Sequence, residues 1–267
     1  MLRQRRRMQG PPIYTVFVEL CLIYDAAGTL LRNRSVMEIL AIFNAKGGVA
    51  KTTTAVNLAT CFAALGQRVL IFDLDSQGNA TSCLGIATAP EIGTYDVITG
   101  RVAIRDAIQD TFMENVKLIA ATKTLAAIDF DFLLGDNKKD IIRKVVQPIK
   151  KDIDIIVLDC PPAFGLMTVN ALVSADAVLI PSQPTPFAHD GLLRTWTILC
   201  RLRSELNRKL SIIGILPTFI PANEDKTSGA DTQRANCNSI LSTMNAEFGD
   251  IVHTEGVPLD LSLFTEA

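Results

Sequence analysis

The chain has 267 residues, of which 48% are hydrophobic and 20% are charged, and its formal net charge is −2. This length and composition are typical of one sizeable α/β domain with a buried core, with room for a second domain but no need of one. A charge so close to zero excludes DNA binding through the overall field of the molecule, so any DNA contact requires a local basic patch.

The first 36 residues differ in character from the rest of the chain. A cluster of arginines precedes an apolar stretch at 13–24 and a run of small residues, an order typical of a secretory signal peptide. Glu19 interrupts the apolar stretch, so we favour the alternative that translation begins at Met37 and that residues 1–36 are an extension outside the fold. An anchor at a membrane surface is a third interpretation. We therefore place the domain at residues 37–267.

Beyond Met37, apolar runs alternate with amphipathic stretches. The apolar runs are continuous, which is typical of strands covered by helices on both faces. The alternation predicts an α/β fold, a doubly wound and mostly parallel sheet with helices on both faces. The predicted strands are 39–43, 69–72, 116–120, 155–158, 177–180 and 212–216. The predicted helices are 51–66, 139–151, 166–174, 188–207 and 232–247.

The segment 44–54, with the sequence NAKGGVAKTTT, lies between the first predicted strand and the first predicted helix. That position suits a phosphate-binding loop, because the unpaired N–H groups at the start of a helix point toward an anion. Gly47 and Gly48 would let the backbone curl around phosphate oxygens. Lys51 would neutralise the β- and γ-phosphates, and the Thr52 hydroxyl would bind Mg²⁺. The sequence thus predicts a nucleoside triphosphate site.

The segment does not satisfy the ordinary pattern GxxxxGK[ST], because Ala45 and Ala50 stand where glycine is required. It carries a second lysine, Lys46, directly before the glycine pair. In this it resembles the deviant Walker A family, written KGGVGKT, which includes ParA, MinD and the nitrogenase iron protein. The resemblance implies that Lys46 reaches across a dimer interface to the nucleotide of the partner subunit. The expected nucleotide contacts are Lys46, Gly47, Gly48, Val49, Ala50, Lys51, Thr52 and Thr53.

Three aspartates follow two of the predicted strands, at the edge of the sheet where ligands bind in open α/β folds. Asp159 is interpreted as the Walker B carboxylate that holds Mg²⁺ through its water shell. Asp75 is the better candidate for positioning or deprotonating the attacking water, and Asp73 is assigned to the Mg²⁺ shell. The predicted catalytic residues are therefore Lys46, Lys51 and Asp75, and the predicted metal-binding residues are Thr52, Asp73 and Asp159.

The resemblance to ParA extends from Met37 to the end of the chain. The segments DLDSQGNAT at 73–81 and DCPPAFG at 159–165 are similar to the family's switch I and switch II, with Ser76 and Ala163 as departures. Past Thr218 the similarity is loose, and it implies only that Pro217, Thr218 and Pro221 help to enclose the adenine base. Family members continue past the matching end into a final helix, which we expect to be lacking here.

The resemblance implies a weak ATPase with ATP and Mg²⁺ as cofactors, which dimerises around ATP to position or segregate plasmid or chromosomal DNA or other cargo. It implies a ParB-like activating protein and a location in the bacterial cytoplasm, on the nucleoid if DNA is bound. No apolar run is long enough to predict integral membrane contact. A solvated helix face without a binding role is the alternative interpretation of the basic residues near the end of the fourth long helix. The candidate DNA contacts are Arg201, Arg203, Arg208, Lys209, Lys226 and Arg234.

Three other functions fit parts of this pattern. A positioning ATPase similar to MinD would act on a membrane or a protein scaffold rather than on DNA. A reductase similar to the nitrogenase iron protein would need two suitably placed cysteines per subunit, and only Cys160 lies near the predicted site. A regulatory remnant that does not hydrolyse ATP is disfavoured by the intact Lys51 and Asp75. The scattered cysteines, without a CxxC pair, indicate a reducing compartment.

Overall fold

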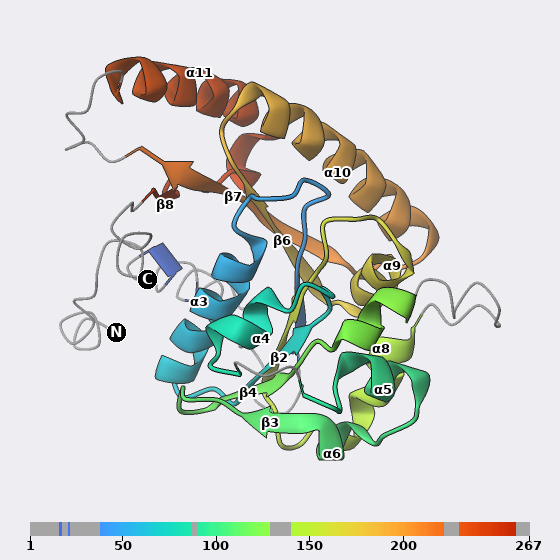
Figure 1. The fold of residues 1–267 in the computed structure, drawn as a ribbon. Helices are drawn as coiled ribbons and strands as arrows, with labels where there is room; N and C mark the ends of the chain where they lie inside the picture. Colours follow the sequence, from blue (N-terminus) through green and yellow to red (C-terminus); the bar gives the residue numbers. More distant parts are fainter. Residues whose placement is uncertain are drawn as a thin grey trace.

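A central sheet of eight strands organises the molecule, in the order β3-β4-β2-β5-β1-β6-β7-β8 (Figure 1). The computed structural model of the chain describes residues 16, 17, 21, 38–86, 90–128, 140–221 and 230–259. Neighbouring strands run parallel except β3 and β4, which are antiparallel. The strands are β1 (Glu38–Ile42), β2 (Val69–Asp73), β3 (Ile108–Asp110), β4 (Val116–Ile119), β5 (Ile155–Asp159), β6 (Ala177–Ser182), β7 (Ser211–Ile220) and β8 (Val257–Pro258).

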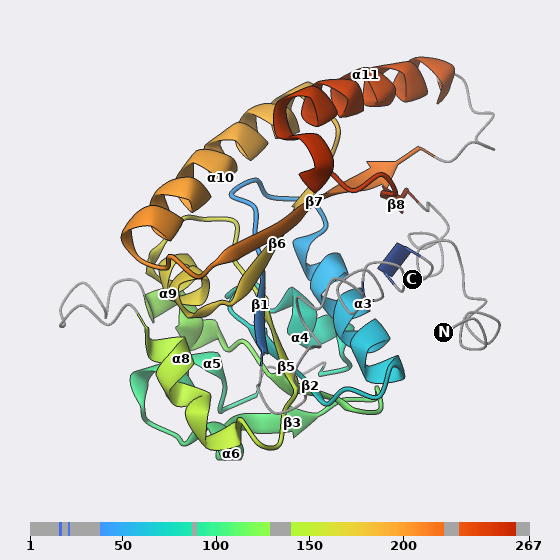
Figure 2. The same ribbon diagram turned by 180° about the vertical axis from the view of Figure 1, so that it is seen from behind.

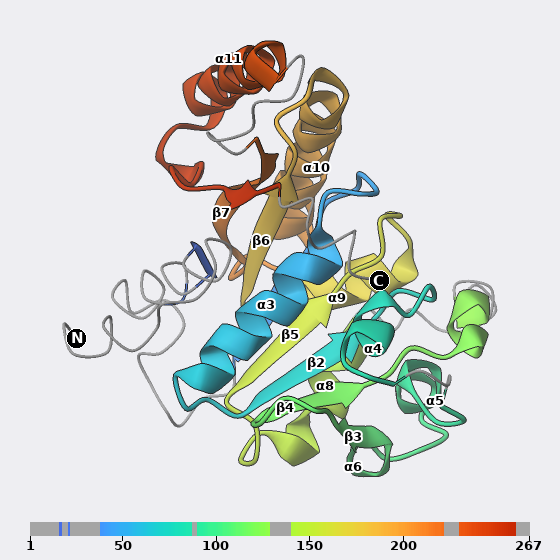
Figure 3. The same ribbon diagram turned by 60° about the vertical axis from the view of Figure 1, so that its left-hand side comes forward.

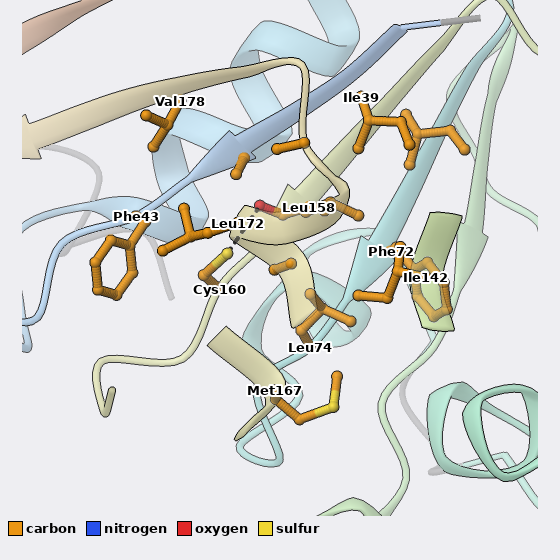
Figure 4. Packing of buried hydrophobic residues seen from close by; sticks show 14 of the residues in the cluster. Ile39, Phe43, Phe72, Leu74, Ile142, Leu158, Cys160, Met167, Leu172 and Val178 are labelled. Carbon is orange, nitrogen blue, oxygen red and sulfur yellow. Dashed lines mark hydrogen bonds between the residues drawn. The ribbon is translucent and has the colours of Figure 1, made fainter. Parts of the chain in front are cut away.

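Helices cover both faces of the sheet, as the continuous apolar runs predicted. Along β1, Ile39 and Ala41 belong to one buried cluster, while Leu40 and Ile42 belong to the other. The first cluster includes residues of α8, α9 and α10, and Figure 4 shows part of it around Leu158 and Leu172. The second includes the buried face of α3. Burial on both faces explains why these strands read as unbroken apolar runs.

The helices agree with the predicted ones where amphipathic stretches were long. The prediction 166–174 coincides with α9, and 188–207 and 232–247 correspond to α10 and α11. The stretch predicted at 139–151 is, from residue 140 on, two short helical segments. The helices are α3 (Lys51–Ala64), α4 (Asn79–Cys83), α5 (Thr94–Thr99), α6 (Ile104–Ala107), α8 (Ile141–Val145), α9 (Leu166–Ser174), α10 (Pro186–Glu205) and α11 (Ala230–Phe248), with 3₁₀ turns η1 (Lys123–Ala127), η2 (Gln147–Ile149) and η3 (Gly249–Ile251).

The strand order brings the three site segments together. β1 lies between β5 and β6, and Ile42 at its end pairs with Asp159 at the end of β5. Asp73 at the end of β2 pairs with Asp159 from the other side. The loop after β1, the start of α4 and the start of α9 therefore meet at one end of the sheet (Figure 3).

The long helices α10 and α11 lie beside the β6–β7 side of the sheet (Figure 2). The end of α11 packs on the first half of α10, where the rings of Trp196, in the middle of α10, and Phe248 pack edge to face with centroids 5.3 Å apart. His189 Nε2 also lies 3.2 Å from Glu247 Oε2. The first half of α10 also lies close to the loop that follows β1, since a Cβ atom at Gly191 would lie 3.3 Å from Lys46 Cβ.

Three residues of the predicted N-terminal extension are described, namely Val16, Phe17 and Cys21. All three are buried, and Phe17 and Cys21 have no exposed surface. They belong to the cluster beneath α3. Most of residues 1–36 and the end of the chain after Leu259 lie outside the described residues, so the domain boundary at Met37 and the expected lack of a final helix stay predictions.

Candidate functional site

The loop between β1 and α3 has the curled backbone that the glycine pair predicted. Gly48 has φ +70° and Ala50 has φ 62° and ψ 34°, both in the left-handed region. Helix α3 starts at the next residue, and the Thr54 amide donates to the Ala50 carbonyl at 2.9 Å. A residue with a Cβ pays about 1–2 kcal/mol for this conformation. Ala50 is therefore less favourable than glycine at this position because of its backbone conformation, although its side chain is small.

The two lysines of the loop lie in different surroundings. Lys51 is 7% exposed, and its Nζ donates to the Lys46 carbonyl at 2.9 Å. Burial lowers the pKa of the Lys51 ammonium, and the charge of Asp159 opposes this shift. Lys46 is exposed. One lysine thus lies inside the loop, where a bound phosphate would sit, and the other faces outward.

The Thr52 hydroxyl and the Asp159 carboxylate form the predicted metal-binding pair. Thr52 Oγ1 donates to Asp159 Oδ2 at 2.8 Å. Asp159 is 1% exposed, and its other oxygen, Oδ1, is buried without a hydrogen-bond partner among the described residues. An unpaired buried carboxylate oxygen is costly, and a cation would satisfy it. These two residues fit Mg²⁺, which binds few protein oxygens and keeps waters and phosphates as its other ligands.

The carboxylates of Asp73 and Asp159 lie on paired positions of adjacent strands. Burial raises the pKa of Asp159 to about 7, and the negative charge of Asp73 adds to this shift. Burial also raises the pKa of Asp73, to about 6. Positive charge placed between these groups would favour their ionised forms. Within the described part of the chain, no group of three or more His, Cys, Asp or Glu side chains is arranged to hold a metal by itself.

Asp73 holds the switch-like loop that follows it. Its Oδ2 accepts hydrogen bonds from the amide and the hydroxyl of Thr81 at 2.9 and 2.7 Å. Its Oδ1 accepts from the Asp75 amide at 3.2 Å. The Thr81 hydroxyl in turn accepts from the Ala121 amide at 2.9 Å. This structural role was not predicted, and the metal role of Asp73 stays a prediction.

Asp75 lies at the start of this loop and is partly exposed. Its Oδ1 accepts the Gln77 amide at 3.0 Å, which orients the carboxylate. The Gly78 amide donates to the Asp75 carbonyl at 2.9 Å, and Gly78 has φ +66°, so the turn is closed at a residue without a Cβ. The structure therefore brings Asp75 to the same end of the sheet as Lys51 and Asp159.

The residues predicted near the adenine base lie close to the loop. Thr218 is fully buried, and its hydroxyl donates to the Val49 carbonyl at 3.3 Å. Pro217, one residue earlier on β7, is also buried. Phe219 has φ 57° where the pairing of β7 with β8 shifts its register. Contact of these residues with the base stays a prediction.

Cys160, the cysteine that a redox function would use, is 1% exposed. Its Sγ lies 3.7 Å from the Leu158 carbonyl, inside the core cluster (Figure 4). Burial strongly raises the pKa of this thiol. These surroundings are those of a small core residue.

The basic residues predicted to contact DNA divide into two places. Arg201, Arg203, Arg208 and Lys209 are exposed at or just after the end of α10. Arg234 lies near the start of α11, at the opposite end of the helix pair, and pairs with Asp231 (Figures 1 and 2). It does not join the other four. Lys226 lies outside the described residues.

The sequence analysis assigned no role to two residues that support the loop. Thr195 on α10 and Asn44, the first residue of the segment 44–54, are fully buried and hydrogen-bonded to each other at 3.0 Å. Thr195 is distant in sequence and belongs to no motif, and the one sequence signal is a hydroxyl residue at the spacing of the apolar positions Leu192 and Leu199.

Comparison with known proteins shows the family to which the chain belongs. The sequence profile of an AAA domain family, AAA_31, matches residues 37–212. The chain is 40% identical over 186 residues to the sporulation initiation inhibitor protein Soj of Bacillus subtilis, covering 69% of this chain and 74% of Soj. It belongs to the ParA/Soj family of partition ATPases. The protein is thus an ATPase of the ParA family, as the deviant Walker A loop predicted.

Other members of the family and several solved structures are similar to this chain. The chromosome partitioning protein ParA of Caulobacter vibrioides is 34% identical over 225 residues, covering 83% of this chain and 80% of that protein. The cobyrinic acid a,c-diamide synthase of Mycobacterium smegmatis, solved with an ATP analogue and magnesium, has a TM-score of 0.74 at 28% identity, covering 84% and 87% of the two chains. A putative plasmid partition protein of Borrelia burgdorferi bound to AMPPNP has a TM-score of 0.69 at 22% identity, covering 87% and 91%, and shows the fold alone. The mostly parallel α/β fold of these ATPases is confirmed.

Proposed function

We propose that this ParA-family ATPase is a switch that dimerises around Mg-ATP and segregates or positions plasmid or chromosomal DNA. The observation that carries the proposal is the division between the two loop lysines. Lys51 is buried against its own loop, whereas Lys46 is exposed on the outer side. An exposed lysine beside a phosphate site is available to the nucleotide of a second molecule. Relatives named as chromosome partitioning proteins support the cargo.

In this proposal each residue of the site has one task. Bound Mg-ATP would supply the triphosphate and the charge neutralisation of its leaving group. Thr52 and Asp159 would hold the cation, and the loop amides with Lys51 would bind the phosphates. Asp75, oriented by the Gln77 amide, would position the attacking water. Lys46 from the second subunit would place positive charge where the transition state gathers negative charge.

Three substitutions separate these tasks. Lys51→Ala should abolish ATP binding, because the buried charge that faces the phosphates is lost. Lys46→Ala should bind ATP and remain monomeric by light scattering. Asp75→Ala should bind ATP, dimerise and accumulate as an ATP-bound dimer without turnover. A Lys46→Ala protein that dimerises normally with ATP would contradict the role across the interface.

DNA binding is assigned to the exposed basic residues at the end of α10, namely Arg201, Arg203, Arg208 and Lys209. Arg201 Nε also lies 2.9 Å from Glu205 Oε1, so the other three are the stronger phosphate contacts. Because phosphate contacts release counterions, the logarithm of the affinity should fall linearly with the logarithm of the salt concentration.

The assay is retention on non-specific duplex DNA with ATP, with ADP and without nucleotide, at several salt concentrations. The Arg203→Ala/Lys209→Ala protein should lose affinity for all sequences alike and have a salt slope shallower by about 2. Arg234→Ala is the control, since this residue lies at the other end of the helix pair. ATP-dependent sedimentation with anionic liposomes but not with DNA would instead support a positioning ATPase of the MinD kind. Among the described residues, no helix has the length and apolar character to cross a bilayer.

A further inference from the structure

Helix α10 contacts the first half of the phosphate loop through a buried hydrogen-bond network. Thr195 Oγ1 accepts from the Ala45 amide at 3.1 Å, and its one proton lies within hydrogen-bond distance of Asn44 Oδ1, at 3.0 Å, and of the Gly191 carbonyl, at 2.9 Å. Asn44 Oδ1 also accepts from the Lys46 amide at 2.9 Å, and Asn44 Nδ2 donates to the Pro181 carbonyl at 2.8 Å. The backbone from residue 44 to residue 46 is therefore held between β6 and α10.

The same helix also contacts the Lys46 side chain. A Cβ atom at Gly191 would lie 3.3 Å from Lys46 Cβ, 3.8 Å from its Cγ and 3.9 Å from its Cδ. The aliphatic stem of Lys46 thus lies directly on the α10 backbone, one turn before Thr195. Glycine is unfavourable in the interior of a helix, so its presence needs a packing reason. The stem of Lys46 supplies that reason.

The second half of the loop is held by different contacts. Lys51 and Thr52 begin α3, and they bond to the Lys46 carbonyl and to Asp159. Neither contact involves α10. The side chains of the second half of the loop therefore bond to β5 and to the loop itself, whereas α10 supports the first half.

We infer that Asn44, Gly191 and Thr195 are positioning residues that aim Lys46 at the nucleotide of the partner subunit. This inference rests on the proposed function of Lys46. Charge delivered to a transition state must be held within a fraction of an ångström, and a misplacement of about 1 Å can cost about 100-fold in rate. Loosening the network should therefore weaken ATP-dependent dimerisation and turnover while leaving ATP binding by the monomer intact.

The first test is Thr195→Val in the full chain, which keeps the shape of the side chain and removes its hydroxyl. We expect kcat and the affinity of the ATP-dependent dimer to fall by about tenfold, with ATP affinity changed by less than about threefold. Thr195→Ser restores the hydroxyl and should restore both. The matched control is Thr197→Val, because Thr197 is exposed on α10 and its Oγ1 bonds only to the Leu193 carbonyl at 2.9 Å, four residues earlier, among the described residues.

The second test is Gly191→Ala, which does not depend on a buried hydrogen bond. Alanine favours the helix, so the thermal midpoint should stay level or rise. The added methyl group displaces the Lys46 stem, so dimer affinity and kcat should nevertheless fall by about tenfold. A variant that is more stable and less active cannot be explained by partial unfolding.

Three results would overturn the inference. In one, Lys46→Ala abolishes the dimer but Thr195→Val and Gly191→Ala behave like Thr197→Val, so the proposed function stands and positioning by α10 is refuted. In another, Lys46→Ala itself dimerises and turns over ATP normally, so the proposed function fails and this inference fails with it. Loss of ATP binding in Thr195→Val with no rescue by serine would also refute the inference, because the residue would then have a merely structural role.

Discussion

Ala50 offers a quantitative test of the strain in the phosphate loop. Its φ of 62° and ψ of 34° lie in the left-handed region, which costs a residue with a Cβ about 1–2 kcal/mol. Glycine adopts this conformation freely, but it also increases the conformational entropy of the unfolded chain, which costs about 0.4–1 kcal/mol. The difference lies between about 0 and 1.6 kcal/mol, so Ala50→Gly should raise the free energy of unfolding, by about 0.8 kcal/mol at the middle of that range.

The assay is equilibrium unfolding in urea without nucleotide, comparing midpoints at an unchanged m-value. The matched control is Ala64→Gly, in the exposed last turn of the same helix, α3. There the backbone is helical, so the identical substitution should lower the free energy of unfolding by up to about 1 kcal/mol. Because the substitution is the same at both positions, changes of opposite sign in the free energy of unfolding would identify the backbone conformation as the cause.

Nucleotide binding provides a second readout for Ala50→Gly. The loop already has the conformation that glycine prefers, so the amides should stay in place and ATP affinity should change by less than about twofold. If Ala50→Gly destabilises the protein as much as Ala64→Gly does, the left-handed conformation carries no strain and the reasoning is refuted.

Three further outcomes follow from the structure. Burial and the charge of Asp176 raise the pKa of Glu38 from 4.5 to about 8, and Glu38 Oε2 is buried without a hydrogen-bond partner among the described residues. The folded state therefore binds the carboxyl proton of Glu38 more tightly than the unfolded state does, and the free energy of unfolding falls as pH rises from about 4.5 to 8. Glu38→Gln should remove that loss, gaining on the order of 2 kcal/mol over the wild type at pH 8 and little at pH 5 in urea titrations, and an equal gain at both values would contradict the shift. Phe17→Ala should cost roughly 3–5 kcal/mol if Phe17 packs beneath α3 as seen, whereas an unchanged urea midpoint would support an extension outside the fold. Thr52→Val should raise the Mg²⁺ concentration needed for ATP-induced thermal stabilisation by about tenfold or more, and an unchanged Mg²⁺ titration would remove Thr52 from the cation site.

Much of the site could be predicted because its chemistry is local. Gly48 and Lys51 lie a few residues apart between a strand and a helix, and a helix start presents its amides to an anion wherever it occurs. Asp159 follows a continuous apolar run, which placed it at the end of a buried strand. Short elements were missed for the converse reason, since β8 has too few residues to show a period.

The sequence alone determined the parallel sheet, the phosphate loop and the family, because hydrophobic period and contiguous motifs are properties of neighbouring residues. Only the tertiary structure decided that Asp73 holds the loop through Thr81, that Arg234 stands apart from the basic end of α10, and that Thr195 and Gly191 contact the loop. The contacts of Asp73 and Thr195 join residues from 8 to 150 positions apart. The packing of helices on the sheet brings residues this far apart in sequence into contact, and no local sequence pattern predicts such contacts.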